Sequence, residues 1–314
     1  MKYGFFSGIL WGLDTVILGI GLAMAPYVGT AAAAAFASIV GSFLHDAFCA
    51  IWLFGYMALK GRLKDTVASL KTRSGKVVVL GALLGGPIGM TGYVIAISNI
   101  GAAYTAIISA FYPAVGAFLS YVLLKERMTK GQMVALCAAL LGVMAMGYLS
   151  AGSSEMANAP LGLLGAALTV IGWGSEAVLC AWGMKDDSVD NETALQIRET
   201  TSALVYGIVV LPMFGAWGFA STAIPSVATG FIALSGLAGA ASYLFYYKGI
   251  STIGAAKAMA LNISYSAWAV VFGFLLLGTV PTIPSVVCCV VILVGTILAA
   301  TDWNELFGKQ AASS

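Results

Sequence analysis

Ten long apolar runs divide the sequence, and each is long enough to cross a membrane as a helix, which needs about 20 mostly apolar residues. The runs lie at 3–25, 31–59, 77–97, 102–124, 131–149, 161–182, 193–217, 225–248, 253–277 and 284–302. Only 9% of the 314 residues are charged, against about 25% in a soluble domain. So few charges cannot cover a water-exposed surface. We therefore expect an all-α integral membrane protein with ten transmembrane helices.

The Lys and Arg residues predict how these helices are oriented. If the N-terminus is cytoplasmic, the basic segment 60–76 and the basic loop 125–130 are cytoplasmic too. The loops on the opposite side, around 26–30, 98–101, 150–160, 215–225 and 278–284, hold no Lys or Arg. Because basic loops stay in the cytoplasm, we expect both termini on the cytoplasmic side of a bacterial inner membrane.

A long internal match indicates that the chain is a repeat. IGAAYTAIISAFYPAVGAF at 100–118 aligns without gaps onto IGAAKAMALNISYSAWAVV at 253–271. This match predicts two five-helix repeats, 1–152 and 153–314, in one transmembrane domain. Five is an odd number, so the second repeat must enter the membrane from the opposite side. Inverted repeats of this kind are typical of secondary transporters, whose sites lie near the midplane.

The opening helix of each repeat carries an acid three residues after the Trp of a Trp-Gly pair. ILWGLDTVIL holds Trp11 and Asp14, and IGWGSEAVL holds Trp173 and Glu176. Ionisable residues inside a membrane are costly and are functional by default. Glu176 is expected either to balance a cationic substrate, proton or sodium ion, or to be a protonated group that only holds helices together. Asp14 has the same two interpretations, coupling to a proton or cation, or packing.

Four further ionisable residues are candidates within the apolar runs: His45, Asp46, Arg198 and Glu199. His45 and Asp46 are adjacent near the middle of the second run and would form either a proton relay or a satisfied polar pair. Arg198 lies near the start of the seventh run, where its side chain is expected to snorkel to the cytoplasmic interface. We expect a structural role for Arg198, in a pair with a carboxylate on the cytoplasmic side.

Several aromatic residues lie in the middle of the runs, away from the interfaces where Tyr and Trp normally gather. They are Trp11, Tyr112, Trp173, Tyr265 and Trp268, and Asn262 shares a predicted helix face with the last two. Core packing is one explanation. A site for a quaternary ammonium ion is the other, because such an ion has no N–H donor. It is held by ring faces, at about 0.5 to 2 kcal/mol each, and by a carboxylate.

The third run contains GALLGGPIGMTG, with Pro87 inside the expected span. Proline removes a backbone hydrogen bond and kinks a helix, and glycine allows close contact between helices. Pro87 therefore predicts either a gate or a site of close packing.

Four segments carry a resemblance to a known family: GPIGM at 86–90, WGSEAVL at 173–179, IRETTS at 197–202 and AKAMALNISYSAW at 256–268. With the ten helices and the repeat, they resemble the drug/metabolite transporter superfamily and, within it, the bacterial Lic-type choline permeases. The resemblance implies choline import and an aromatic box with a carboxylate. The matching positions are Trp11, Tyr112, Trp173, Glu176, Tyr265 and Trp268. An acid at position 14 departs from the pattern and leaves open a substrate with an extra polar or charged group.

The sequence thus predicts a secondary transporter that moves choline, or a similar small amine, by alternating access. Export of amino acids or of toxic cations is the alternative. An intramembrane enzyme would need a nucleophile–base or metal constellation, and the chain has neither HExxH nor GxSxG and a single His. We expect no cofactor, no metal and, at a net charge of +2, no nucleic-acid partner. The oligomeric state stays open, a homodimer included.

Overall fold

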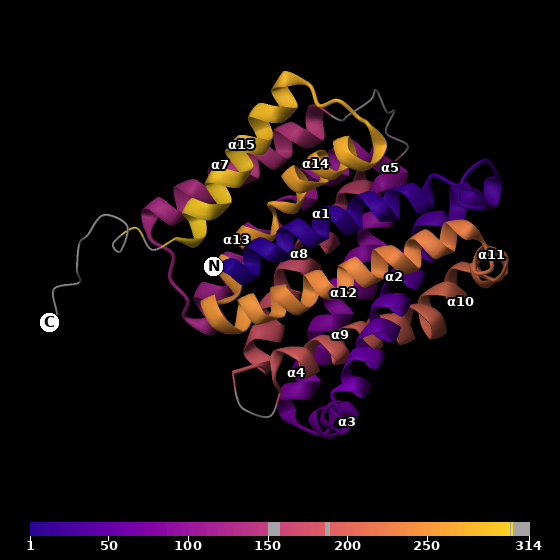
Figure 1. Cartoon of the computed structure of the whole chain (residues 1–314), viewed down its shortest axis with the longest axis horizontal. Helices are drawn as coiled ribbons and strands as arrows, with labels where there is room; N and C mark the ends of the chain where they lie inside the picture. Colours follow the sequence, from indigo (N-terminus) through magenta and orange to yellow (C-terminus); the bar gives the residue numbers. More distant parts are fainter. Residues whose placement is uncertain (150–157, 186–188, 302, 304–314) are drawn as a thin grey trace, which may run out of the picture.

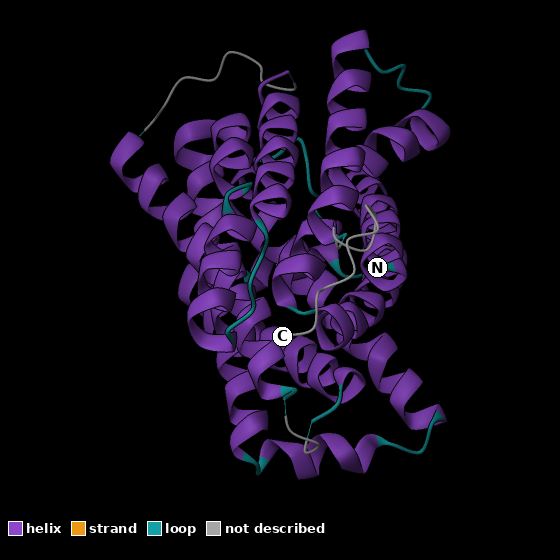
Figure 2. Ribbon diagram, turned by 90° about the vertical axis from the view of Figure 1, so that its left-hand side faces the viewer, coloured by secondary structure: helices purple, strands orange, loops and turns teal. Residues whose placement is uncertain are grey.

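The computed structural model describes residues 1–149, 158–185, 189–301 and 303, and these residues form helices and short connections without a strand (Figure 2). The elements, in chain order, are α1 (Lys2–Leu22), α2 (Ala31–Leu59), α3 (Leu63–Leu70), α4 (Arg73–Leu83), η1 (Leu84–Met90), α5 (Thr91–Ser109), α6 (Tyr112–Leu119), η2 (Ser120–Leu124), α7 (Lys130–Leu149), α8 (Ala159–Gly183), α9 (Asn191–Val205), η3 (Tyr206–Val210), α10 (Leu211–Phe214), α11 (Trp217–Ala223), α12 (Val227–Ile253), α13 (Ala255–Asn262), α14 (Tyr265–Leu277) and α15 (Ile283–Ala300). The elements marked η are π-helical.

Ten helical stretches of the described chain are long and apolar enough to span a membrane. They are Lys2–Leu22, Ala31–Leu59, Arg73–Gly101, Ile107–Leu124, Lys130–Leu149, Ala159–Gly183, Asn191–Phe214, Val227–Ile253, Ala255–Leu277 and Ile283–Ala300. Each coincides with one predicted run, apart from shifts of a few residues at the ends. The predicted all-α, ten-helix membrane fold is confirmed.

The helices pack in a pattern that repeats between the two halves of the chain. α1 packs along α12, and also against α13 and α14 (Figure 1). α8 makes the equivalent contacts with α4, η1, α5 and α6. The first helix of each half thus packs against the third and fourth helices of the other half. The predicted repeat boundary at 152/153 lies outside the described residues, and the division into 1–152 and 153–314 stays a prediction.

The two glycines that open the long internal match break the helix in the same way. Gly101 has φ 80° and ψ 159°, and Gly254 has φ 88° and ψ 159°. A side chain disfavours this region, which glycine adopts at little steric cost. At Gly254 the carboxylate of Glu126 accepts hydrogen bonds from the backbone N–H groups of Ala255 and Ala256 at 3.1 and 3.2 Å. After the break, α13 therefore begins with the Glu126 carboxylate bound to the N–H groups of its first turn.

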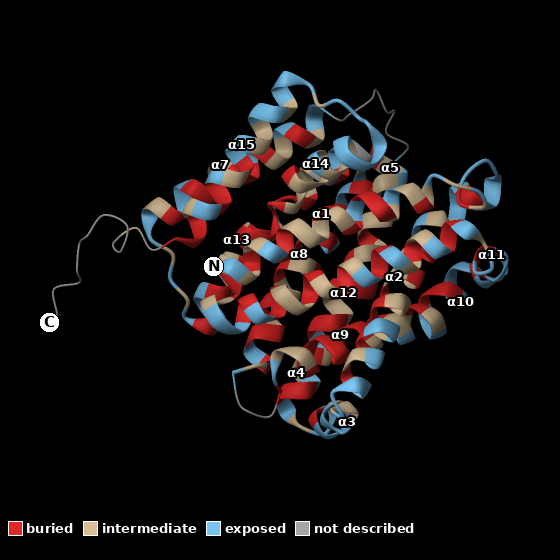
Figure 3. Ribbon diagram, viewed as in Figure 1, coloured by how far each residue is buried: buried red, intermediate tan, exposed pale blue. Residues whose placement is uncertain are grey.

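Burial separates the centre of the bundle from its periphery. Figure 3 shows buried residues along the inner faces of the helices and exposed residues on the outer faces. Many of the exposed side chains are large and apolar, such as Ile51, Ile208 and Leu275. Lipid tails are as apolar as these side chains, so the outer faces suit a bilayer, and many polar side chains within the spans are buried in the interior.

At the end of the bundle that holds α3, an ion-pair cluster joins the connection after α2 to the start of α9. Arg62 donates to Asp65 at 2.7 Å, to Glu192 at 2.6 Å and to Asp190. Burial opposes the ionisation of Asp190, but hydrogen bonds from Thr193 and Arg62 outweigh it and lower the pKa of that carboxyl. The cluster holds the start of α9 beside α2, which sets the position of the ionisable residues further along both helices.

Candidate functional site

Arg198 on α9 lies at the centre of a cluster of acidic side chains from three helices. Its Nε donates to Glu176 Oε1 on α8 at 2.7 Å. Its Nη1 lies 2.9 Å from Glu199 Oε1 and 3.7 Å from Asp46 Oδ2 on α2. The guanidinium carbon also lies 4.8 Å from the centroid of the Tyr243 ring on α12. Arg198 therefore links α2 of the first half to α8, α9 and α12 of the second half.

The expectation that Arg198 snorkels to the interface is wrong. Its side chain is only 4% exposed and is held in the interior by Glu176. A charge taken out of water needs close partners of opposite sign. The prediction rested on the short distance along the chain from Arg198 to the start of its run. It did not include the acids of α2 and α8, which only the fold brings within reach of the guanidinium.

Glu199, the neighbour of Arg198, is fully buried. Among the described residues, neither of its carboxyl oxygens has a hydrogen-bond partner, and the Nη1 of Arg198 has none either. The 2.9 Å contact between the two groups is thus a close ion contact without the alignment of a hydrogen bond. Glu199 is the least satisfied polar side chain of the cluster.

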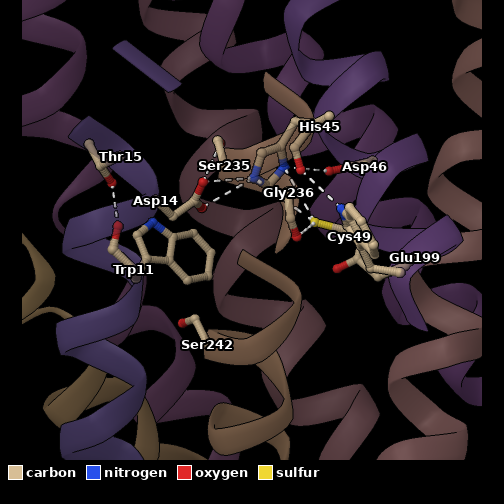
Figure 4. Close-up of polar contacts among 12 residues, drawn as sticks. Trp11, Asp14, Thr15, His45, Asp46, Cys49, Glu199, Ser235, Gly236 and Ser242 are labelled. Carbon is tan, nitrogen blue, oxygen red and sulfur yellow. Dashed lines mark hydrogen bonds and ion pairs between the residues drawn. The ribbon is translucent and has the colours of Figure 1, made fainter. Parts of the chain in front are cut away.

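A second polar group extends the cluster through His45 (Figure 4). His45 Nε2 lies 3.1 Å from both carboxyl oxygens of Asp14, and its Nδ1 lies 3.4 Å from Asp46 Oδ1. Ser235 donates to Asp14, and Ser202 donates to Asp46 Oδ2 at 2.5 Å. Because Asp46 also faces Arg198, polar contacts run without a break from Asp14 to Glu176.

The predicted aromatic residues form two groups. In the first, the Trp11 ring lies 4.7 Å from Tyr243 and 5.9 Å from Tyr265 between centroids. Tyr243 is the ring that Arg198 covers. The structure thus brings Trp11 and Tyr265 together, and it connects them through Tyr243 to the acidic cluster.

The second group surrounds Trp173. Its ring lies 5.3 Å from Tyr93 and 5.8 Å from Tyr112. The hydroxyl of Tyr112 donates to Asn262 Oδ1 at 3.4 Å, which connects α6 to α13. Trp173 and Glu176 share α8, so this group is also tied to the acidic cluster.

Trp268 lies apart from both groups. Among the described residues the aromatic ring nearest to it is that of Phe5, at 5.8 Å between centroids. The predicted common face of Asn262, Tyr265 and Trp268 is interrupted after Asn262, because α13 ends at Asn262 and α14 begins at Tyr265. Threefold spacing describes one face only while the helix is continuous. Asn262 instead donates to Ser7 Oγ at 2.7 Å.

Pro87 lies inside η1, a π-helical stretch between α4 and α5. Proline leaves a carbonyl without its usual helical partner, and one wider turn is a common response. The glycines around it allow the backbone of η1 to approach the side chains of α8 closely. A Cβ at Gly85 would lie 1.7 Å from Glu176 Oε2, and one at Gly89 would lie 3.0 Å from Trp173 Cδ1.

Sequence reasoning did not select Tyr93 and Tyr243 as site aromatics, and it gave Glu199 no role of its own beside Arg198. Tyr243 belongs to SYLFYYKG, where three tyrosines in one apolar run were a usable signal. Glu199 was visible as a second ionisable residue beside Arg198. Ser202 and Ser235 gave no signal, because a single Ser in an apolar helix is common and only the packing shows what it bonds.

A ten-helix membrane bundle with a polar, aromatic-lined interior defines a membrane transporter. The chain belongs to the EamA-like transporter family, whose model matches residues 1–148 and 160–301. The predicted relation to the drug/metabolite transporter superfamily is thereby confirmed.

One relative and one solved structure illustrate these similarities. The chain is 30% identical over 203 residues to Protein LicB of Haemophilus influenzae, which covers 63% of this chain and 65% of that protein. The matched part is thus just under two thirds of the length of LicB. A crystal structure of a protein with 16% identity has a TM-score of 0.70 and covers 99% of this chain and 98% of its own. This likeness shows the fold alone.

Proposed function

We propose that the protein imports choline, or a similar small quaternary or tertiary amine, across a bacterial inner membrane by alternating access. The observation that carries the proposal is the position of Glu176. Its carboxylate lies on α8 one helical turn after Trp173, and Arg198 connects it to the ring of Tyr243. An acid with ring faces on both sides is what a methylated ammonium ion requires.

The charge of the interior also favours a cation. Four carboxyl groups, those of Asp14, Asp46, Glu176 and Glu199, face one guanidinium and one imidazole in this cluster. When all of these groups are ionised, two negative charges are left without a partner. An anionic substrate would be repelled, whereas a monovalent cation or a proton would be attracted.

The two aromatic groups supply the ring faces. Trp11, Tyr243 and Tyr265 form one group, and Trp173 and Tyr112 belong to the other. Trp11 and Tyr112 both pack against the same buried core of the bundle. We propose that these rings receive the methyl groups of the substrate, and that Trp268 and Asn262 support the site from behind through Phe5 and Ser7.

Asp14, His45 and Asp46 form the proposed proton-coupling group. The imidazole of His45 lies between two carboxylates, so it can take up a proton and keep a partner on either side. With an inside-negative potential, a monovalent cation gains about 2.3 kcal/mol per 100 mV on entry. The potential alone therefore suffices for uptake, and a bound proton would add to it.

The experiment that tests the function is a thermal-shift panel followed by counterflow. Choline, betaine, carnitine, ethanolamine and aromatic amino acids are added to the purified protein, because a ligand of the folded state raises its melting temperature by mass action. We expect the largest rise with choline. We expect little with betaine and carnitine, whose carboxylates would face Glu176. Choline-loaded proteoliposomes should then take up labelled choline. Stabilisation and exchange by an amino acid, without either by choline, would support the exporter alternative and overturn the proposal.

A further inference from the structure

The position of Arg198 raises the question of what occupies the site when no substrate is bound. We propose that Arg198 is a tethered cation that fills the substrate site in the empty transporter and must release Glu176 before an amine binds. This inference rests on the proposed function, because it takes Glu176 as the acid that receives the amine.

The guanidinium already makes both kinds of contact that the substrate needs. Its Nε is 2.7 Å from Glu176 Oε1, and its carbon is 4.8 Å from the Tyr243 centroid. Guanidinium groups bind both carboxylates and aromatic faces well. Among the described residues Glu176 has no other ion pair. A substrate ammonium therefore finds its carboxylate occupied and has to compete for it.

A second acid lies ready to receive the guanidinium. Glu199 Oε1 is 2.9 Å from Nη1, and Asp46 Oδ2 is 3.7 Å from the same atom. In the part of the chain that the structure describes, neither oxygen of Glu199 has a hydrogen-bond partner. Arg198 can thus turn from Glu176 toward Glu199 and remain paired, without the large penalty of an isolated buried charge. The substrate takes Glu176, and the displaced Arg198 takes Glu199.

This exchange makes positive charge a condition for binding. A neutral or anionic ligand cannot replace the guanidinium on Glu176, since it would leave the carboxylate without a counter-charge. The exchange also lowers the apparent affinity for the amine, because only the fraction of molecules with Glu176 released can bind it. If about one molecule in ten has released Glu176, the apparent Kd is about tenfold above the intrinsic value.

The test uses the double variant Arg198→Gln/Glu199→Gln, which removes one positive and one negative charge and leaves the net charge of the cluster unchanged. Choline binding is measured by calorimetry on the full-length protein in detergent. We expect the double variant to bind choline about tenfold more tightly than the unsubstituted protein. We also expect millimolar methylguanidinium to raise the melting temperature of the double variant saturably, and not that of the unsubstituted protein. A folded double variant that binds choline equally or more weakly would overturn the proposal.

The single variant Glu199→Gln provides a second test that does not depend on the double variant being folded. It removes the alternative partner of Arg198 and leaves Glu176 and the rings in place. We expect choline affinity to fall severalfold while the melting temperature without ligand changes little. An unchanged or higher choline affinity would contradict the exchange.

The two proposals fail in different ways. If choline gives no binding heat with the unsubstituted protein or with any variant, the proposed function is wrong. The methylguanidinium measurement then tests by itself whether Arg198 acts as a tethered cation. Saturable stabilisation confined to the double variant supports the tethered cation, and its absence overturns it.

Discussion

The Nε of Arg198 lies 2.7 Å from Oε1 of Glu176, and this contact joins the sixth and seventh membrane spans inside the bundle. The acid that stands out most in the sequence is therefore paired with a cation from a neighbouring helix. Its chemistry cannot be considered without that partner. Binding of a substrate cation, movement of protons and packing of α8 against α9 all involve the same two side chains.

Glu176→Gln keeps the size of the side chain and removes its charge. We expect choline binding to weaken by about 2 kcal/mol, or ~30-fold, because one partner of a buried ion pair is lost. Calorimetry at several pH values measures the effect. The matched control is Glu192→Gln, which removes an acid that pairs with Lys60 and Arg62 instead. Equal affinity of the Glu176→Gln variant and the unsubstituted protein would exclude Glu176 from the site.

Trp173→Leu keeps an apolar side chain and removes a ring face. We expect choline affinity to fall by about 1 to 2 kcal/mol, whereas Trp173→Phe should retain most of the binding. Trp217→Leu is the control, because Trp217 contacts Phe43 on the outer part of the bundle. Should the Leu and Phe variants of Trp173 bind equally, the ring at this position would have no role in cation binding.

Asp14→Asn tests the proposed proton coupling. With the membrane potential clamped at zero, a gradient of one pH unit can drive about tenfold accumulation if one proton accompanies each choline. We expect Asp14→Asn to lose this accumulation while choline counterflow continues, because the amide cannot exchange a proton with His45. Uptake into proteoliposomes measures both quantities. The control is Asp65→Asn, which changes an acid paired with Arg62. Accumulation equal to that of the unsubstituted protein would remove Asp14 from the coupling group.

Gly85→Ala tests the close contact between η1 and Glu176. The added Cβ would lie 1.7 Å from Glu176 Oε2 and 2.7 Å from Glu176 Cβ, so a rotation of the carboxylate alone cannot relieve the overlap. We expect about 1 to 3 kcal/mol of destabilisation, together with weaker choline binding. Gly230→Ala on α12, where nothing lies within 4 Å of the added atom, should leave the melting temperature unchanged or raise it. Equal melting temperatures for the two variants would mean that η1 does not press on Glu176.

The membrane fold was predictable because each span can be recognised from its own run of apolar residues. Some 20 apolar residues in a row have few alternatives to a helix in lipid, and this holds whatever the rest of the chain does. Hence the ten spans agree with the prediction from Lys2–Leu22 to Ile283–Ala300. Breaks in the helices inside the spans were harder to predict from the sequence. The interruption after Asn262 depends on how α13 and α14 pack, and it separates Asn262 on α13 from Tyr265 and Trp268 on α14.

The sequence by itself determined the ten apolar spans, the repeated Trp-Gly-x-acid motif and the small set of ionisable residues inside the spans. Only the tertiary structure decided how those residues are paired. Asp14 lies beside His45, and Glu176 beside Arg198, so the two symmetric acids have different partners. The physical reason is that the two kinds of signal act over different separations along the sequence. Apolar length acts within one helix, whereas an ion pair depends on distances of a few ångströms between helices far apart in sequence, and on the exclusion of water that strengthens it.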